Sequence, residues 1–103
     1  MNTAIQSRSS GFTYILTNDR QTVLYIGCTG DLAKRVHFHK KRLIPGFSKK
    51  YNVHRLVYFE QHPTIEQARK REKSLKGKTR AKKIALIEAG NPSWNDLESQ
   101  IPK

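Results

Sequence analysis

An acidic residue within a strongly basic segment is the first feature of this sequence that suggests chemistry. Glu72 is the single acid in residues 69–83, which carry nine Lys and Arg. It falls between Ala68 and Leu75 on the inward stripe of a predicted helix. An inward carboxylate is most often one half of a structural ion pair. The alternative is a ligand for a divalent cation beside bound phosphate, because such cations prefer oxygen ligands.

Arg35 and His39 are a second candidate pair, four residues apart and therefore on one face of a helix. An Arg guanidinium presents a planar fork to phosphate oxygens, and a neighbouring His can donate a hydrogen bond or move a proton. The same spacing is also common on helix surfaces that have no task. The pair by itself therefore leaves both interpretations open.

Tyr14 and Tyr25 lie in two short segments, residues 12–16 and 23–26, whose aromatic and β-branched residues predict strands. Residues 17–22 are short enough to join these strands as an antiparallel hairpin, with Gly27 ending the second. Strand tyrosines are usually packing residues. In this hairpin, however, the two hydroxyls can meet at one sheet edge near the next helix, where Gly27 allows close approach of the backbone to a ligand.

The remaining elements must position these side chains. A helix is expected from an N-cap at Thr29 or Asp31 to about residue 43, before Pro45 and Gly46, and a third strand over residues 55–60. Thr64 and Gln67 form a capping box that starts a helix to about residue 75. A further helix covers residues 80–89, and residues 93–96 resemble a second capping box before a last helical turn. The order β-β-α-β-α-α predicts an α+β domain with a small three-stranded antiparallel-type sheet flanked by helices.

The chain has 103 residues, which is material for one domain. Residues 1–10 are expected to form a flexible arm, and residues 11–103 a single domain. Cys28 is the single cysteine, which excludes an intrachain disulfide and a cysteine-based zinc site. Residues 1–10 lack the apolar core of a signal peptide, and no segment approaches the roughly 18 apolar residues of a membrane span. We therefore expect a cytoplasmic protein.

Charge points to a polyanionic partner. Twenty Lys and Arg against eight Asp and Glu give a net charge of +12, which favours nucleic acid over a merely solvated basic surface. Residues 34–50 and 69–83 hold 16 of the 20 basic residues. Such segments contact phosphates and do not read base sequence. The lysines expected to bind nucleic acid are Lys34, Lys40, Lys41, Lys49, Lys50, Lys73 and Lys76.

Together these residues resemble the GIY-YIG nuclease superfamily, in particular its small stand-alone bacterial proteins, which are similar to the GIY-YIG catalytic module of the bacterial excinuclease. The resemblance covers residues 12–97. The second half of the motif is intact as Tyr25-Ile26-Gly27, whereas in Phe12-Thr13-Tyr14 only the tyrosine matches. Arg35, His39 and Glu72 follow in order, and the ending Asn91-Pro92-x-Trp94 is typical of the stand-alone group.

The resemblance implies a divalent-metal-dependent phosphodiesterase, an endonuclease that uses one Mg²⁺ or Mn²⁺ ion. Glu72 matches the metal ligand, and Tyr14 and Tyr25 match the pair that positions and deprotonates the attacking water. A tyrosine acting as a base requires cationic neighbours that favour the phenolate. Arg35 matches the residue that steadies the pentacoordinate phosphate, and His39 a proton-handling or phosphate-contacting position. These groups are expected to line one cleft, within roughly 10 Å of a common point.

Supporting roles are implied for Gly27, Asn91 and Tyr51. The implied substrate is DNA, cleaved with weak sequence specificity or by recognition of DNA structure, in repair or recombination. One alternative is a non-catalytic nucleic-acid-binding module that retains the fold. Another is a basic protein associated with RNA.

Overall fold

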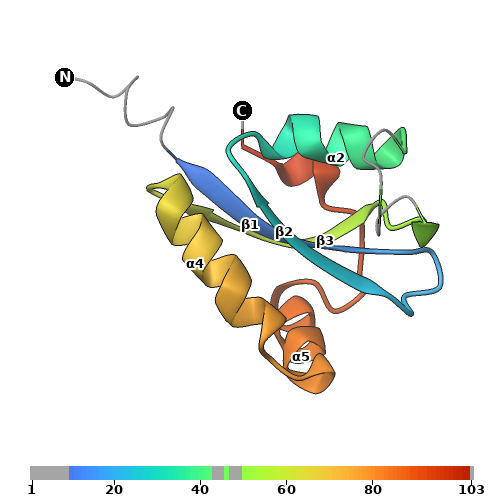
Figure 1. Cartoon of the computed structure of the whole chain (residues 1–103). Coiled ribbons are helices and arrows are strands. Elements are labelled where there is room, and N and C mark those ends of the chain that lie inside the picture. Colours follow the sequence, from blue (N-terminus) through green and yellow to red (C-terminus); the bar gives the residue numbers. More distant parts are fainter. Residues whose placement is uncertain (1–9, 43–45, 47–49, 103) are drawn as a thin grey trace.

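A three-stranded antiparallel sheet with helices on both faces forms the fold, which confirms the predicted α+β class (Figure 1). The computed structural model describes residues 10–42, 46 and 50–102. Its elements are β1 (Gly11–Thr17), β2 (Leu24–Thr29), α2 (Leu32–Lys40), β3 (Arg55–His62), α4 (Ile65–Lys76), α5 (Arg80–Gly90) and the short 3₁₀ helix η1 (Glu98–Gln100). Most of the predicted arm lies outside the described residues. The prediction that the first helix reaches about residue 43 is wrong, because α2 ends at Lys40 and Arg42 has a left-handed φ of 56°.

The strand order is β2-β1-β3, which makes β1 the buried centre of the sheet. In the hairpin, Tyr14 pairs with Gly27 and Leu16 with Tyr25. The prediction that Gly27 ends the second strand is wrong, because the pairing continues through Cys28 to Thr29. β3 likewise continues to His62 on the other side of β1. The longer hairpin carries β2 up to the start of α2.

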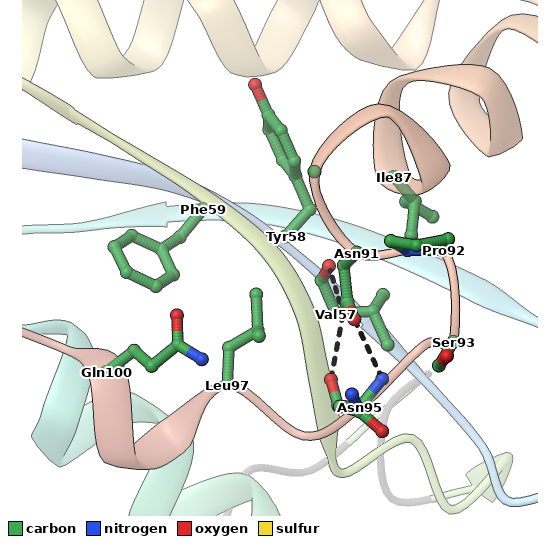
Figure 2. Close-up of a pocket in the computed structure, with 11 residues that line it drawn as sticks. Val57, Tyr58, Phe59, Ile87, Asn91, Pro92, Ser93, Asn95, Leu97 and Gln100 are labelled. Atoms are coloured by element: carbon green, nitrogen blue, oxygen red, sulfur yellow. Dashed lines mark hydrogen bonds between the residues drawn. The ribbon is translucent and has the colours of Figure 1, made fainter.

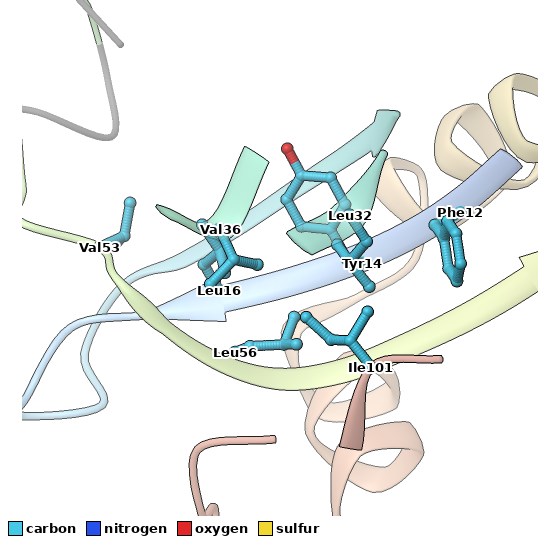
Figure 3. Packing of buried hydrophobic residues seen from close by; sticks show 8 residues of the cluster. All are labelled: Phe12, Tyr14, Leu16, Leu32, Val36, Val53, Leu56 and Ile101. Carbon is cyan, nitrogen blue, oxygen red and sulfur yellow. The ribbon is translucent and has the colours of Figure 1, made fainter. Parts of the chain in front are cut away.

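Period-two alternation divides the apolar side chains of the strands between two clusters, one on each face of the sheet. Phe12, Tyr14 and Leu16 of β1 pack with Leu32 and Val36 of α2 (Figure 3). Ile101, beyond η1, completes this cluster. The opposite cluster joins strand residues to α4, α5 and the C-terminal segment, and consists of Ile15, Ile26, Val57, Leu75, Ile87 and Trp94. Figure 1 shows α2 on one face and α4 and α5 on the other.

Side-chain caps fix where the helices begin. The side chain of Asp31, not that of Thr29, caps α2 and accepts a hydrogen bond of 3.1 Å from the Lys34 backbone N–H. Thr64 caps α4 as predicted, and its hydroxyl accepts from the Gln67 N–H at 3.1 Å. Because these caps satisfy N–H groups that have no partner within the helix, they hold each helix start in register with the strand before it.

The C-terminal segment departs from the prediction. Residues 93–96 do not form a capping box, because Trp94 has a left-handed φ of 56° that ends helical geometry. Asn91 organises the turn instead: its amide donates to the carbonyls of Val57 at 3.1 Å and Asn95 at 2.9 Å, and its oxygen accepts from the Asn95 N–H (Figure 2). The last helical turn is the 3₁₀ helix η1, which begins two residues after Asp96.

None of the helices in the described part of the chain has the length and apolar run that crossing a membrane requires.

Candidate active site

Three aromatic side chains from three elements meet on the α2 face of the hairpin. The ring centroids of Tyr14 and Tyr25 lie 6.4 Å apart, and the His39 ring lies 6.1 Å from Tyr14 and 5.3 Å from Tyr25. The Tyr14 hydroxyl is 3.4 Å from His39 Nε2. Its oxygen points away from the other labelled apolar side chains (Figure 3). The hairpin therefore places the two phenols together, and α2 places an imidazole against both.

Burial controls the protonation of this cluster. His39 is 3% exposed, and burial, with Arg35 adding to it, lowers the pKa of His39 to about 4. Burial also raises the pKa of Tyr14. The charges of Tyr25 and Glu72 raise this pKa further, and the charge of Arg35 lowers it. Arg35 is the cationic neighbour that the sequence predicted for a tyrosine base, but burial affects the pKa of Tyr14 more strongly than Arg35 does. Both groups are neutral near pH 7, so Tyr14 and His39 can share one proton along their contact.

Arg35 lies one helical turn before His39 on α2 and is half-buried. Its charge acts on both Tyr14 and His39. A guanidinium in this position can hold phosphate oxygens beside the phenols.

Glu72 reaches the same region from α4, on the other side of edge strand β2. Its carboxylate forms an ion pair with Lys76 at 2.8 Å and accepts a hydrogen bond from the Cys28 thiol. Although burial opposes the effect, these two partners hold the pKa of Glu72 below its ordinary value. Glu72 in turn acts on Tyr14, and the Tyr25 phenol acts on Lys76. The Glu72 carboxylate therefore acts electrostatically on the Tyr14 phenol across the β2 edge.

The donor set fits a hard divalent cation that is completed by its substrate. The described residues contain no group of three or more His, Cys, Asp or Glu side chains that could hold a metal ion. This excludes a closed, protein-only metal cage within that part of the chain. Mg²⁺ is usually held by one or two carboxylates, water and substrate phosphates. The Glu72 side chain, 19% exposed, suits that role.

The structure shows other contacts for two predicted supporting residues. Asn91 is buried, and its hydrogen bonds join the end of α5 to β3 and to the following turn (Figure 2). Tyr51 is 42% exposed, and the Lys50 ammonium lies 5.4 Å from its ring centroid. Their support for catalysis stays a prediction.

The lysines predicted to bind nucleic acid differ in how their charge is used. Lys40 is paired with Asp96 and Glu98 and so secures the C-terminal segment to α2. The Lys34 ammonium lies 5.6 Å from the ring centroid of Phe38. Lys76 is paired with Glu72, whereas Lys41, Lys50 and Lys73 are exposed and Lys49 lies outside the described residues.

The sequence reasoning missed the contact between Cys28 and Glu72. Strand alternation contains the signal for it, because Cys28 lies one position after Gly27 and so points to the opposite face, toward α4. It also missed the partner of Arg71, whose guanidinium makes a bidentate ion pair with Glu60 of β3. Because Arg71 pairs with Glu60, Glu72 forms its ion pair with Lys76 and not with Arg71, its neighbour in sequence.

Comparisons with known proteins identify the family of this chain. The family model described as the GIY-YIG catalytic domain matches residues 10–85. A UPF0213 protein of Clostridium perfringens is 30% identical over 90 residues, which cover 87% of this chain and 96% of that protein. The solution NMR structure of a UPF0213 protein from Bacillus halodurans shares the fold, with a TM-score of 0.54 and 24% identity over 84% of this chain and 92% of that one. The chain therefore belongs to the GIY-YIG family of nuclease domains, within its small stand-alone group.

Proposed function

We propose that this protein is a divalent-metal-dependent endonuclease that hydrolyses phosphodiester bonds of DNA. The observation that carries the proposal is the convergence of Glu72, Arg35 and the Tyr14–His39 contact at the β2 edge. These elements supply an oxygen ligand, a cation for phosphate and a neutral proton acceptor, which are the parts that one-metal hydrolysis requires.

In the proposed reaction, Glu72 holds the cation, Mg²⁺ or Mn²⁺, which when bound polarises a phosphoryl oxygen and stabilises charge on the leaving oxygen. Tyr14 and Tyr25 orient the attacking water. As the water oxygen bonds to phosphorus, its proton passes to the Tyr14 oxygen while the Tyr14 proton passes to His39 Nε2. The bond from phosphorus to the leaving sugar oxygen breaks, that oxygen takes a proton from solvent, and His39 later returns its proton to solvent. The His39 imidazole is neutral near pH 7 and can therefore accept this proton, and its Nε2 lies 3.4 Å from the Tyr14 oxygen.

Arg35 is proposed to stabilise the transition state, where negative charge gathers on the phosphoryl oxygens. Arg35 is half-buried on α2, and its charge acts on both Tyr14 and His39, so it would also act on a phosphate beside the phenols. The exposed lysines contact neighbouring phosphates, which position the DNA without reading its bases. We therefore propose weak sequence specificity or recognition of nicks and branches, in DNA repair or recombination.

A cleavage assay tests the proposal. Labelled nicked, branched, single-stranded and duplex DNA is incubated with Mg²⁺ or Mn²⁺ and with the wild-type chain, Glu72→Ala or Arg35→Ala. Each variant is expected to lose at least about 100-fold in rate, since each removes a group that acts on transition-state charge. Glu66→Ala is the matched control, because Glu66 is an exposed acid on the same helix. Cleavage that persists in Glu72→Ala would contradict the proposal.

A specific observation favours a second candidate, the non-catalytic nucleic-acid-binding module. Glu72 is already held by Lys76 and Cys28, as a purely structural carboxylate would be. This candidate predicts DNA binding without divalent-dependent cleavage, unaffected by Glu72→Ala. RNA bound more tightly than DNA, with neither cleaved, would indicate the RNA-associated alternative.

A further inference from the structure

A small pocket adjoins the candidate active site along the edge of β2. It has a volume of about 260 Å³ and is lined by Leu24, Tyr25, Ile26, Lys76 and Lys83. Tyr25 and Lys76 also border the candidate active site, so the two sites share a wall. A substrate strand in one is therefore adjacent to the other.

The lining combines cations with apolar strand residues. Lys76 comes from the end of α4 and Lys83 from the first turns of α5, and both meet the β2 edge. Leu24 and Ile26 supply an apolar surface between them and belong to the packed face under α5. A nucleotide unit has the matching chemistry, with an anionic phosphate at one side and a largely apolar sugar and base at the other.

Lys83 is the cation without a partner in this pocket. It is half-buried, yet no carboxylate in the described part of the chain lies within ion-pair distance of it. The Lys76 ammonium, by contrast, is shared with Glu72. A lysine that lines a pocket and lacks a counter-charge favours an anion there. The volume lies below the roughly 300–1,000 Å³ of drug-sized sites, which suits a single nucleotide unit.

We propose that this pocket binds the nucleotide next to the scissile phosphate, with the phosphate of that nucleotide between Lys76 and Lys83 and its sugar and base against Leu24 and Ile26. The inference rests on the proposed function for its position relative to the cut, although binding itself requires no cleavage. It assigns the substrate strand a path along the β2 edge, from the phenols toward the start of α5. The exposed face of α4 lies beside that path.

Binding without a metal tests this pocket separately from catalysis. Fluorescence anisotropy in EDTA measures the affinity of a fluorescein-labelled single strand of about 15 nucleotides and of a duplex of the same sequence. Lys83→Ala is compared with Lys82→Ala, which removes the same charge one residue away at an exposed position. We expect Lys83→Ala to weaken binding several-fold for every sequence and to lower the salt slope of log K by about one. Lys83→Arg should restore most of the loss.

Equal weakening by Lys83→Ala and Lys82→Ala would overturn the pocket and leave only a general effect of net charge. Circular dichroism verifies that each variant is folded. If wild type cleaves DNA while the two alanine variants bind alike, only the pocket is wrong. If Lys83→Ala alone weakens binding while no variant or wild type cleaves, the pocket stands and the proposed nuclease activity is wrong.

Discussion

The hydroxyl group of Tyr14 lies directly against the backbone of Gly27, its register partner across the hairpin. A Cβ atom at position 27 would come within 2.6 Å of the Tyr14 oxygen and 2.7 Å of the ring carbon that carries it. Tyr14 is 1% exposed and packed within the α2 cluster, so its ring has little room to yield. The glycine of the motif is therefore required by the position of the Tyr14 phenol.

Gly27→Ala is expected to lower the free energy of unfolding by about 1–3 kcal/mol, because the new methyl group overpacks a buried aromatic ring. The displaced ring should also lose its contact with His39, and cleavage should fall with it. Urea unfolding measures the first effect. The cost should shrink when Tyr14→Leu removes the ring, and an undiminished cost in that double variant would contradict the steric explanation.

Tyr14→Phe tests the proton path. The substitution keeps the ring and removes the hydroxyl that contacts His39, so cleavage should fall by about 100-fold or more while the fold is retained. Tyr58→Phe is the matched control, since the Tyr58 hydroxyl donates to Glu60 in the ion-pair network with Arg71, away from the hairpin phenols. Equal rates for Tyr14→Phe and wild type would show that the hydroxyl takes no part in proton transfer.

Most elements of the fold could be predicted because local signals coincide with them. The apolar run of β3 and the caps at Asp31 and Thr64 each specify one boundary through neighbouring residues, whereas Gly90, predicted to close α5, is its last residue and Asn91 is the C-cap. The proximity of Tyr14 and Tyr25 follows from the same logic, since residues two register positions apart in a hairpin share a face.

The parts that were missed depend on tertiary contacts. Nothing near Arg71 in the sequence indicates Glu60 as its partner, because the pair depends on how α4 packs against β3. The left-handed Trp94 is also set by packing: its side chain is buried against α5, and its indole N–H donates to Glu88. The ion pair of Glu72 with Lys76 is readable from i,i+4 spacing, but whether Lys76 or a metal ion holds the carboxylate is not.

The hydrogen bonds of Asn91 predict how its substitution affects stability. Asn91→Ala leaves the carbonyls of Val57 and Asn95 without their donor and should lower the free energy of unfolding by about 2–3 kcal/mol. Asn91→Asp keeps the acceptor for the Asn95 N–H and loses both donors, so it should also destabilise. Urea unfolding measures both losses. Activity per folded molecule is measured in both variants: full activity would make the role of Asn91 structural only, whereas a loss of activity without a loss of stability would assign Asn91 to the site, as the family resemblance implies.

His39 should make the protein unstable toward mild acid. Its pKa is about 4 when folded and near 6.5 in an unfolded chain, so between these values the unfolded state binds more protons. The contribution to stability is complete above pH 6.5 and is lost as pH falls toward 4, by about 3 kcal/mol.

Urea unfolding at several pH values between about 7.5 and 4.5 should reveal this slope in wild type and not in His39→Asn. His37→Asn, at an exposed position two residues earlier on the same helix, should retain the wild-type slope. Parallel curves for wild type and His39→Asn would show that burial does not lower the pKa of His39 in the folded state.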